Sequence, residues 1–224
     1  MKAIIILITF IISYLSSHIL QAQTLNWENL KKEEKHILNI NAGWENSMVF
    51  GLHYGYHFRT EKPLVAEASI SIPAGSYFLD DFKTKLGGQI SFYKIDNFRL
   101  NASVHAIYRR YENPLVVFQN FGADATVVLG YYKLKWFASG EFGFDKAILT
   151  RFKHLEIYKE VYPEAKNGWY GPSTGGNFNF GIQGGYSFNR SDITLRAGKV
   201  MTQDFKITPL IPFYVQLGYN YKLD

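Results

Sequence analysis

Apolar and polar residues alternate with a period of two in segment after segment of this 224-residue chain. Neighbouring side chains of a β-strand point to opposite faces, so each alternating segment predicts a strand with one apolar and one polar face. The segments are 36–44, 48–59, 64–72, 82–92, 98–109, 121–131, 136–144, 177–188, 193–198 and 213–223. Most contain about ten residues, which is the length that a tilted strand needs to cross a bilayer.

The two faces differ in a way that suits a membrane. Segment 98–109 places Phe98, Leu100 and Val104 on one face and Arg99 and His105 on the other. A membrane barrel turns its apolar face to lipid and its polar or small residues to the lumen. A soluble sandwich also alternates and is the alternative, but here the opposite face carries Gly, Asn, Gln and charge. We therefore predict an all-β, closed antiparallel up-and-down transmembrane β-barrel of about ten strands, with eight as the alternative, over residues 36–224.

The connections alternate in length, as periplasmic turns and outer loops do. The short ones are residues 59–63, 94–97, 132–135 and 189–192, and the long ones are 73–81, 110–120, 145–176 and 200–212. Residues 45–47 form a short connection on the long-loop side. An even number of strands returns the C-terminus to the side where the barrel begins.

Aromatic residues make up 17% of the chain, and many fall at the ends of the apolar faces. One predicted girdle, beside the short turns, comprises Tyr56, Phe58, Phe92, Phe98, Tyr131, Trp136, Tyr186, Phe188, Tyr219 and Tyr221. The second comprises Trp44, Phe50, Phe82, Tyr108, Phe121, Phe144, Phe178 and Phe213. Two such girdles are typical of outer-membrane barrels.

The first residues predict export rather than fold. Lys2 precedes an apolar run over residues 3–12, and Ala22 precedes Gln23, which is the layout of a signal peptide over residues 1–22. An uncleaved membrane anchor is the alternative. Residues 23–35 would then be a periplasmic N-terminal segment, either a short helix or a disordered stretch. The net charge of +5 is scattered and the chain has no Cys, so we expect neither nucleic-acid binding nor disulfides.

These patterns resemble the small outer-membrane β-barrel proteins of Gram-negative bacteria. The signal ending at Ala22-Gln23 resembles those common in the Bacteroidota. The resemblance implies insertion by the barrel-assembly machinery, which reads an aromatic-rich last strand. Phe213, Tyr219 and Tyr221 match that habit, whereas the end in Leu223-Asp224 departs from the usual terminal aromatic residue.

Charged residues on the polar faces form the first candidate site. We predict a lumen network of Glu67, Lys83, Lys85, Arg99, His105, Asp124, Glu141 and Arg196. Buried charges must be paired, so we expect this network to neutralise itself and plug a narrow lumen. A narrow path for small polar solutes is the alternative. No cofactor is expected.

Catalysis and metal binding were weighed on the same faces. Ser103 and His105 share one strand and Glu141 lies two strands away, which would suit a hydrolase of lipid A or peptides if the three met. No motif surrounds them. His53 and His57 share a face, but two packed lumen histidines are a simpler interpretation than a metal site.

The long connection 146–176 predicts a recognition surface, because loops on a rigid scaffold carry binding. We single out Tyr158, Tyr162, Trp169 and Tyr170 as its contact residues, with a lid over the barrel mouth as the alternative. The first functional hypothesis is a non-enzymatic structural, adhesive or accessory barrel with an extracellular or envelope protein partner, besides the lipid bilayer. A narrow channel and a hydrolase are the others.

Overall fold

The computed structural model describes residues 24–44, 47–75, 80–173, 175–205 and 211–224, and the predicted signal peptide lies outside them. Nearly all of the described chain is β-strand. The elements are β1 (His36–Trp44), β2 (Met48–Phe58), β3 (Leu64–Pro73), β4 (Asp81–Ile95), β5 (Phe98–Glu112), β6 (Val116–Tyr132), β7 (Trp136–His154), α2 (Glu156–Val161), β8 (Gly168–Tyr170), β9 (Gly176–Phe188), β10 (Ser191–Thr202) and β11 (Phe213–Leu223).

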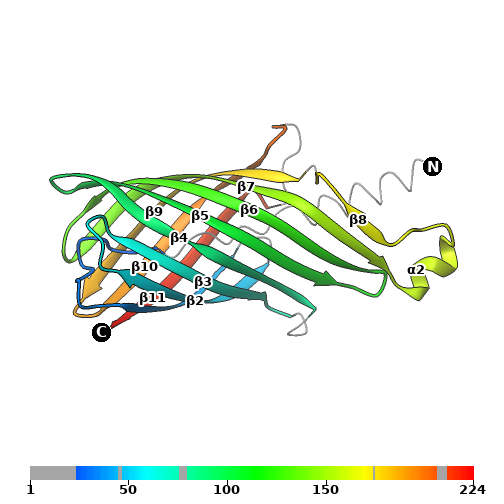
Figure 1. Cartoon of the computed structure of the whole chain (residues 1–224), viewed down its shortest axis with the longest axis horizontal. Coiled ribbons are helices and arrows are strands. Elements are labelled where there is room, and N and C mark those ends of the chain that lie inside the picture. The colour runs from blue at the N-terminus through cyan, green and yellow to red at the C-terminus, as the bar shows by residue number, and fades with distance from the viewer. Residues whose placement is uncertain (1–23, 45–46, 76–79, 174, 206–210) are drawn as a thin grey trace.

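Ten long antiparallel strands close into a barrel, which confirms the predicted fold (Figure 1). The strand order is β6-β5-β4-β3-β2-β1-β11-β10-β9-β7, and pairing between β6 and β7 closes the ring. The three-residue strand β8 lies outside the ring and pairs only with residues 150–152 of β7. No helix in the described part of the chain is long and apolar enough to cross a membrane.

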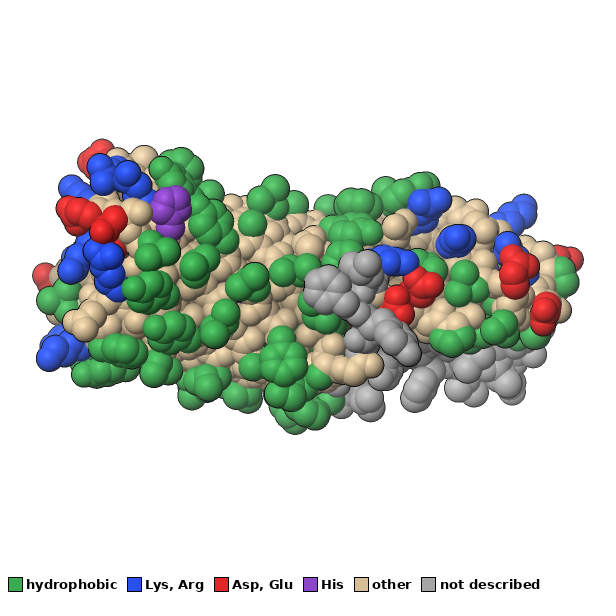
Figure 2. Space-filling model, turned by 90° about the horizontal axis from the view of Figure 1, so that it is seen from below, with side chains coloured by type: hydrophobic (Ala, Val, Ile, Leu, Met, Phe, Trp, Pro, Cys, Tyr) green, Lys and Arg blue, Asp and Glu red, His purple; other side chains and the backbone are tan. Residues whose placement is uncertain are grey.

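The two faces of the wall have opposite polarity, as predicted. Apolar side chains cover the outside, where Leu86 is 68% and Ile182 is 69% exposed. Inward-facing polar side chains are buried, and Asp192 and Asn220 are 0% exposed. Figure 2 shows apolar side chains over the middle of one face of the barrel, with charged side chains gathered at its two ends. This belt between two charged ends is the surface that a bilayer requires.

The two ends of the barrel differ. The short-turn end holds the C-terminus and the four tight connections that follow β2, β4, β6 and β9. Asp96 and Asn189 both adopt a φ of 52° there, a left-handed conformation that Asp and Asn tolerate in two-residue turns. The long-loop end holds the remaining connections, α2 and β8 (Figure 1).

Two of the predicted long loops are wrong, because most of their residues are strand. Residues 110–112 belong to β5 and residues 116–120 to β6, so only residues 113–115 connect them. β7 runs ten residues past Phe144 to His154, which at about 3.3 Å per residue is roughly 30 Å. Together, the outer parts of β5, β6 and β7 with α2 and β8 form an extension beyond the barrel. We call residues 110–120 and 146–173 the β5–β8 extension.

The sequence pattern did not predict the strands of the extension, because their outer and inner faces have the opposite polarity to those of the membrane-facing wall. Arg151 and Lys153 are exposed on the outside of β7, whereas Phe152 lies among the residues that line the interior. On β6 the inward-facing Phe118 is buried. A wall that meets water on its outside can carry charge there and pack aromatic rings within. A search for strands with an apolar outer face therefore does not recognise these residues as strand and assigns them to loops.

Candidate functional site

Residues 24–35 fold into the short-turn end of the lumen and close it. They form turns with no helix, which corrects both expectations for this segment, a short helix or a disordered stretch. An apolar cluster holds the segment inside, and its members are Leu25, Trp27, Ile37, Val65, Tyr132 and Phe137. Tyr132 and Phe137 stack with their ring centroids 5.3 Å apart. We call residues 24–35 the N-terminal plug.

Hydrogen bonds join the plug to several parts of the wall. The side-chain amide of Asn26 donates to the Lys133 carbonyl oxygen (2.9 Å) and to Ser187 Oγ (2.8 Å). Asn220 Nδ2 donates to the Thr24 carbonyl oxygen at 2.7 Å. Asn26 and Asn220 are both 0% exposed. These bonds satisfy polar groups of an irregular backbone inside the barrel, where an unpaired group is costly.

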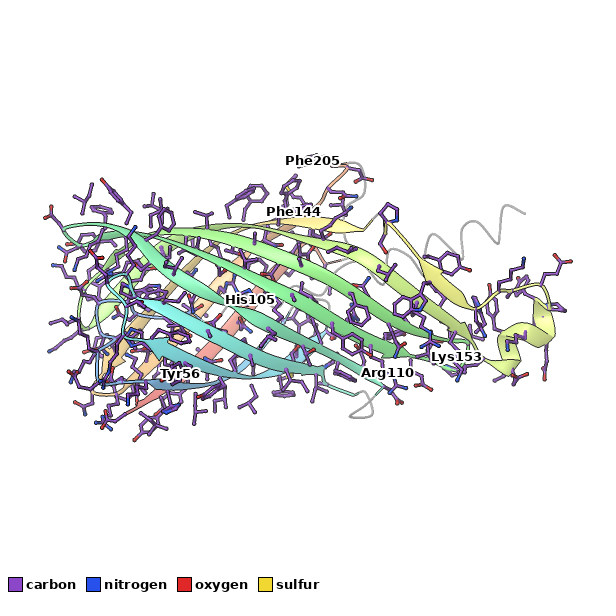
Figure 3. The ribbon with its side chains drawn as sticks, viewed as in Figure 1. Tyr56, His105, Arg110, Phe144, Lys153 and Phe205 are labelled. Carbon is purple, nitrogen blue, oxygen red and sulfur yellow. The ribbon has the colours of Figure 1, made fainter. Side chains whose placement is uncertain are left out.

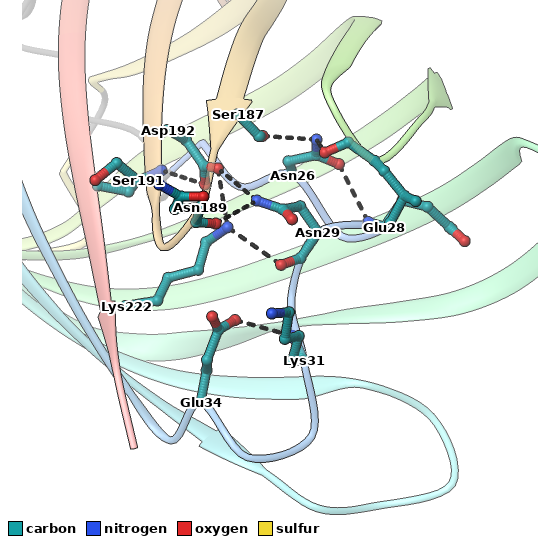
Figure 4. A network of polar contacts seen from close by, with 12 residues as sticks. Asn26, Glu28, Asn29, Lys31, Glu34, Ser187, Asn189, Ser191, Asp192 and Lys222 are labelled. Atoms are coloured by element: carbon teal, nitrogen blue, oxygen red, sulfur yellow. Dashed lines mark hydrogen bonds and ion pairs between the residues drawn. The ribbon is translucent and has the colours of Figure 1, made fainter.

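A buried ion pair completes this closure (Figure 4). Lys222 Nζ lies 2.9 Å from Asp192 Oδ1, and both side chains are fully buried. Lys222 also donates to the Asn29 carbonyl oxygen at 3.3 Å, while Asn29 Nδ2 donates to Asp192 at 3.4 Å. The plug residue Asn29 therefore shares one polar cluster with strands β10 and β11.

The carboxylate of Glu28 joins the plug to β4 and β5. It lies 2.6 Å from Arg99 Nη2 and 2.9 Å from Lys94 Nζ. Burial raises the pKa of Glu28, but hydrogen bonds and charge from Lys94 and Arg99 lower it by more than burial raises it. The pKa therefore lies below its usual value. The predicted lumen residue Arg99 thus pairs with the plug, a partner that sequence reasoning did not supply.

Midway along the barrel, His105 lies between two carboxylates (Figure 3). Its Nδ1 is 3.0 Å from Asp124 Oδ1 and its Nε2 is 2.9 Å from Glu67 Oε2. Asp124 also bonds Lys85, and Glu67 accepts from Gln89. All five side chains are buried. Because the two carboxylates only accept hydrogen bonds, this layer fits an imidazole that donates from both nitrogens, which balances two positive and two negative charges.

Glu141 anchors a second buried layer. Arg196 donates to it from Nε and Nη2, the latter at 2.7 Å, and Gln183 Nε2 donates at 2.9 Å. The Tyr214 hydroxyl also donates to Glu141. Gly181 leaves room for this arrangement, because a Cβ there would lie 2.2 Å from the Tyr214 hydroxyl oxygen. The guanidinium–carboxylate pair is the strong, planar kind that suits a buried site.

The structure does not assemble the trio considered for catalysis. Both ring nitrogens of His105 contact Glu67 and Asp124, and Glu141 bonds Arg196, Gln183 and Tyr214 instead. The hydrolase hypothesis built on Ser103, His105 and Glu141 therefore has no geometric basis. Among the described residues, no three His, Cys, Asp or Glu side chains gather as a metal site would require.

A cavity of about 350 Å³ opens above these layers at the long-loop end. It is lined by the inward faces of β4 to β7, by β8 and by the start of β9. Lys83, the predicted lumen residue not yet placed above, is among its lining residues. We call it the mouth cavity. The other cavities described in the lumen hold only about 20 and 10 Å³.

The four predicted recognition residues lie on the extension rather than on one loop. Tyr158 stacks on His154 (4.7 Å) and on Tyr162 (5.0 Å) at α2. Trp169 and Tyr170 belong to β8, where Trp169 packs on Phe121 outside the wall and Tyr170 lines the mouth cavity. The structure thus separates them into a tip pair and a wall pair.

No protein-family model and no curated protein matches the chain. Solved structures do. An outer-membrane channel from Pseudomonas putida F1 superposes with a TM-score of 0.56 at 9% identity, over 91% of this chain and 100% of that one. The KdgM porin gives 0.44 at 8% identity, and the outer-membrane enzyme PagL gives 0.39 at 12%; each match covers 84% of this chain and 99% of the other.

The likeness to the channel from Pseudomonas putida F1 shows the fold and nothing further. The apolar belt explains why that fold belongs in lipid. This chain is an outer-membrane β-barrel. Its wall meets the bilayer with exposed Leu, Ile, Val and aromatic side chains, while its interior carries buried polar side chains, many of them in ion pairs.

Proposed function

We propose that this barrel is a non-enzymatic accessory or adhesive protein that recognises a partner with its β5–β8 extension and does not conduct as folded. The observation that carries the proposal is a contrast within one molecule. The lumen is filled from the short-turn end to the mouth cavity, whereas α2 at the tip of the extension buries none of its residues. A rigid barrel that displays a projecting structure is suited to recognition.

The tip of the extension has the composition of a protein-binding surface. Ile157 and Val161 of α2 are 56% and 67% exposed, and α2 buries none of its residues. Tyr158 and Tyr162 lie beside them. Aromatic residues are enriched at protein interfaces, and the tip lies too far from the apolar belt to be covered by lipid. An extracellular or envelope protein is the partner that this surface fits.

Two measurements test the proposal. The purified protein should give no conductance steps in a planar bilayer. In gently solubilised outer membranes it should migrate on a native gel as a complex, and replacing residues 155–167 with a short Gly-Ser linker should return it to the monomer position. Replacing the tight turn at residues 133–135 is the control and should leave the complex unchanged. A monomer in wild-type membranes would contradict the proposal.

A narrow gated channel is the second candidate, and the N-terminal plug favours it. The short-turn end is closed by residues 24–35, a segment separate from the barrel strands, rather than by the wall itself. Deleting residues 24–33 should then raise the conductance from silence to discrete steps for small ions. A folded deletion variant that stays silent would rule out gating by this segment.

We also infer the route to the membrane that the sequence suggests. Residues 1–22 would be removed on export, and the barrel-assembly machinery of a Bacteroidota-like bacterium would insert the barrel, with residues 23–35 on the periplasmic side. N-terminal sequencing of the protein from outer membranes should begin at Gln23. Depletion of the assembly machinery should reduce its heat-modifiable form on a gel.

A further inference from the structure

Aromatic rings form an arc around the inside of the mouth cavity. Tyr111, Phe118 and Phe152 are direct neighbours across β5, β6 and β7, and Tyr170 of β8 continues the row. The ring centroids follow one another at 6.0, 4.7 and 5.1 Å. All four residues line the cavity. A curved wall of rings offers stacking surface to a flat ligand.

Cationic groups lie on the same cavity. Lys83, Arg109 and Lys146 line it together with one carboxylate, that of Asp145. Asp145 accepts from the backbone N–H of Asn177 at 2.9 Å and from its side-chain amide at 3.1 Å.

Outside the lining, Asp81 lies 3.5 Å from Arg109, and Lys146 donates to a neutral amide, that of Gln203, at 2.8 Å. With Asp81 included, the described part of the cavity places three cations beside two carboxylates. Its electrostatic balance favours an anion, and the low dielectric of the surrounding wall strengthens that preference.

We propose that the mouth cavity binds a small molecule that combines a planar ring with a carboxylate. The ring packs on the arc of Tyr111, Phe118, Phe152 and Tyr170, and the carboxylate meets the cations. The cavity volume of about 350 Å³ is within the range of small-molecule pockets. This site goes beyond the proposed partner surface, because the α2 tip does not line it.

Calorimetric titration of the full processed chain in lipid nanodiscs tests the ligand class. The probes are 2-naphthoate, the neutral 2-naphthalenemethanol and acetate. We expect saturable 1:1 binding of 2-naphthoate, with the alcohol and acetate each at least tenfold weaker. Equal affinity for the alcohol would overturn the role of the cations. Equal affinity for acetate would overturn the role of the rings, and no saturable binding of 2-naphthoate would overturn the site.

Matched variants locate the binding. Phe152→Leu, which removes a ring from the arc, should weaken 2-naphthoate at least tenfold. Phe121→Leu removes an outward ring from the neighbouring strand, which is 44% exposed, and should leave the affinity unchanged. The corresponding test of charge compares two lysine variants. Lys146→Gln, on the cavity, should weaken 2-naphthoate, whereas Lys153→Gln, on the outside, should leave the affinity unchanged. If Phe152→Leu fails to fold, as judged by heat-modifiable migration, Tyr170→Leu replaces it.

No loss in the inward variants would show partition into lipid, and equal losses in the inward and outward variants would show a general disturbance of the protein. Either result would overturn the assignment. The variant with residues 155–167 replaced separates this inference from the proposed function. It should lose the native-gel complex and still bind 2-naphthoate. The partner surface and the ligand site are therefore tested independently of each other.

Discussion

The two halves of this barrel interior differ in what lines them, although the same strands run through both. We call the half toward the short-turn end the lower half and the half toward the long-loop end the upper half. Toward the short-turn end, the wall meets lipid, and the lumen is filled by the N-terminal plug and by layers of paired charge. Toward the long-loop end, β5 to β7 leave the bilayer, Arg151 and Lys153 lie on the outside, and aromatic rings line a cavity together with charged side chains. The difference shows that inward polarity is set by what the outer face touches, lipid or water.

The largest effect should come from breaking a buried pair in the lower half. Glu141→Ala leaves the Arg196 guanidinium buried, with its carboxylate partner removed. We expect a loss of about 3–5 kcal/mol in the free energy of unfolding, measured by urea titration of the heat-modifiable form in detergent micelles. Glu156→Ala, in an exposed pair of the extension whose atoms lie 3.7 Å apart, should cost less than about 1 kcal/mol.

Equal losses at Glu141 and Glu156 would break the comparison between the two halves. A double variant sharpens it. Glu141→Leu combined with Arg196→Leu removes both charges at once and should recover most of the stability, because the penalty comes from an uncompensated charge rather than from the lost attraction.

Truncating the apolar anchor of the plug should have the next largest effect. Trp27 is 4% exposed within the closing cluster, and Trp27→Ala should weaken docking by about 3 kcal/mol. Because 1.4 kcal/mol is a factor of ten, the released fraction should rise on the order of a hundredfold. Hydrogen exchange of residues 24–35 measures this release, and the barrel strands should stay protected.

Trp169→Ala is the matched control, since Trp169 packs outside the wall at the long-loop end. It should leave exchange in the plug at the wild-type rate. If both tryptophan variants speed exchange equally, the plug is not an independent unit and the two halves are coupled.

Much of the lower half could be predicted from the sequence, since period-two alternation fixes which side chains face inward. The eight lumen candidates are all buried. Their pairing could not be read, because the partners are set by how strands stagger around a closed ring, as with Arg196 and Glu141. The plug was also missed, although Ile37, Val65 and Phe137 carried its signal. Apolar inward residues beside the short turns need an apolar partner in the lumen.

Protonating Glu28 should have a smaller effect on the same plug. Its pKa is lower in the folded protein than its ordinary value of 4.5. A lowered carboxyl pKa stabilises docking fully above the ordinary value, and the contribution is lost as pH falls through the folded pKa. Because the carboxylate is partly exposed, we expect about 1 kcal/mol, seen as faster exchange of residues 24–35 as the pH falls below the ordinary pKa of 4.5.

Glu28→Gln separates this group from the other acids. At pH 7 it should reproduce the faster exchange that the wild type shows in acid, and its own exchange should change little over the same fall in pH after correction for intrinsic rates. A variant that retains the full acid response would assign the pH dependence to a different carboxylate.

The smallest effect should come from the tip of the extension. Ile157→Ser with Val161→Ser removes two exposed apolar side chains from α2, which buries none of its residues. Because both side chains are more than half exposed, urea titration should give a stability within about 0.5 kcal/mol of the wild type, while the native-gel complex should be weakened. A clear loss of stability would mean that the tip supports the barrel, and the upper half would then resemble the lower one. Unchanged stability with a lost complex would show that the exposed apolar surface serves binding.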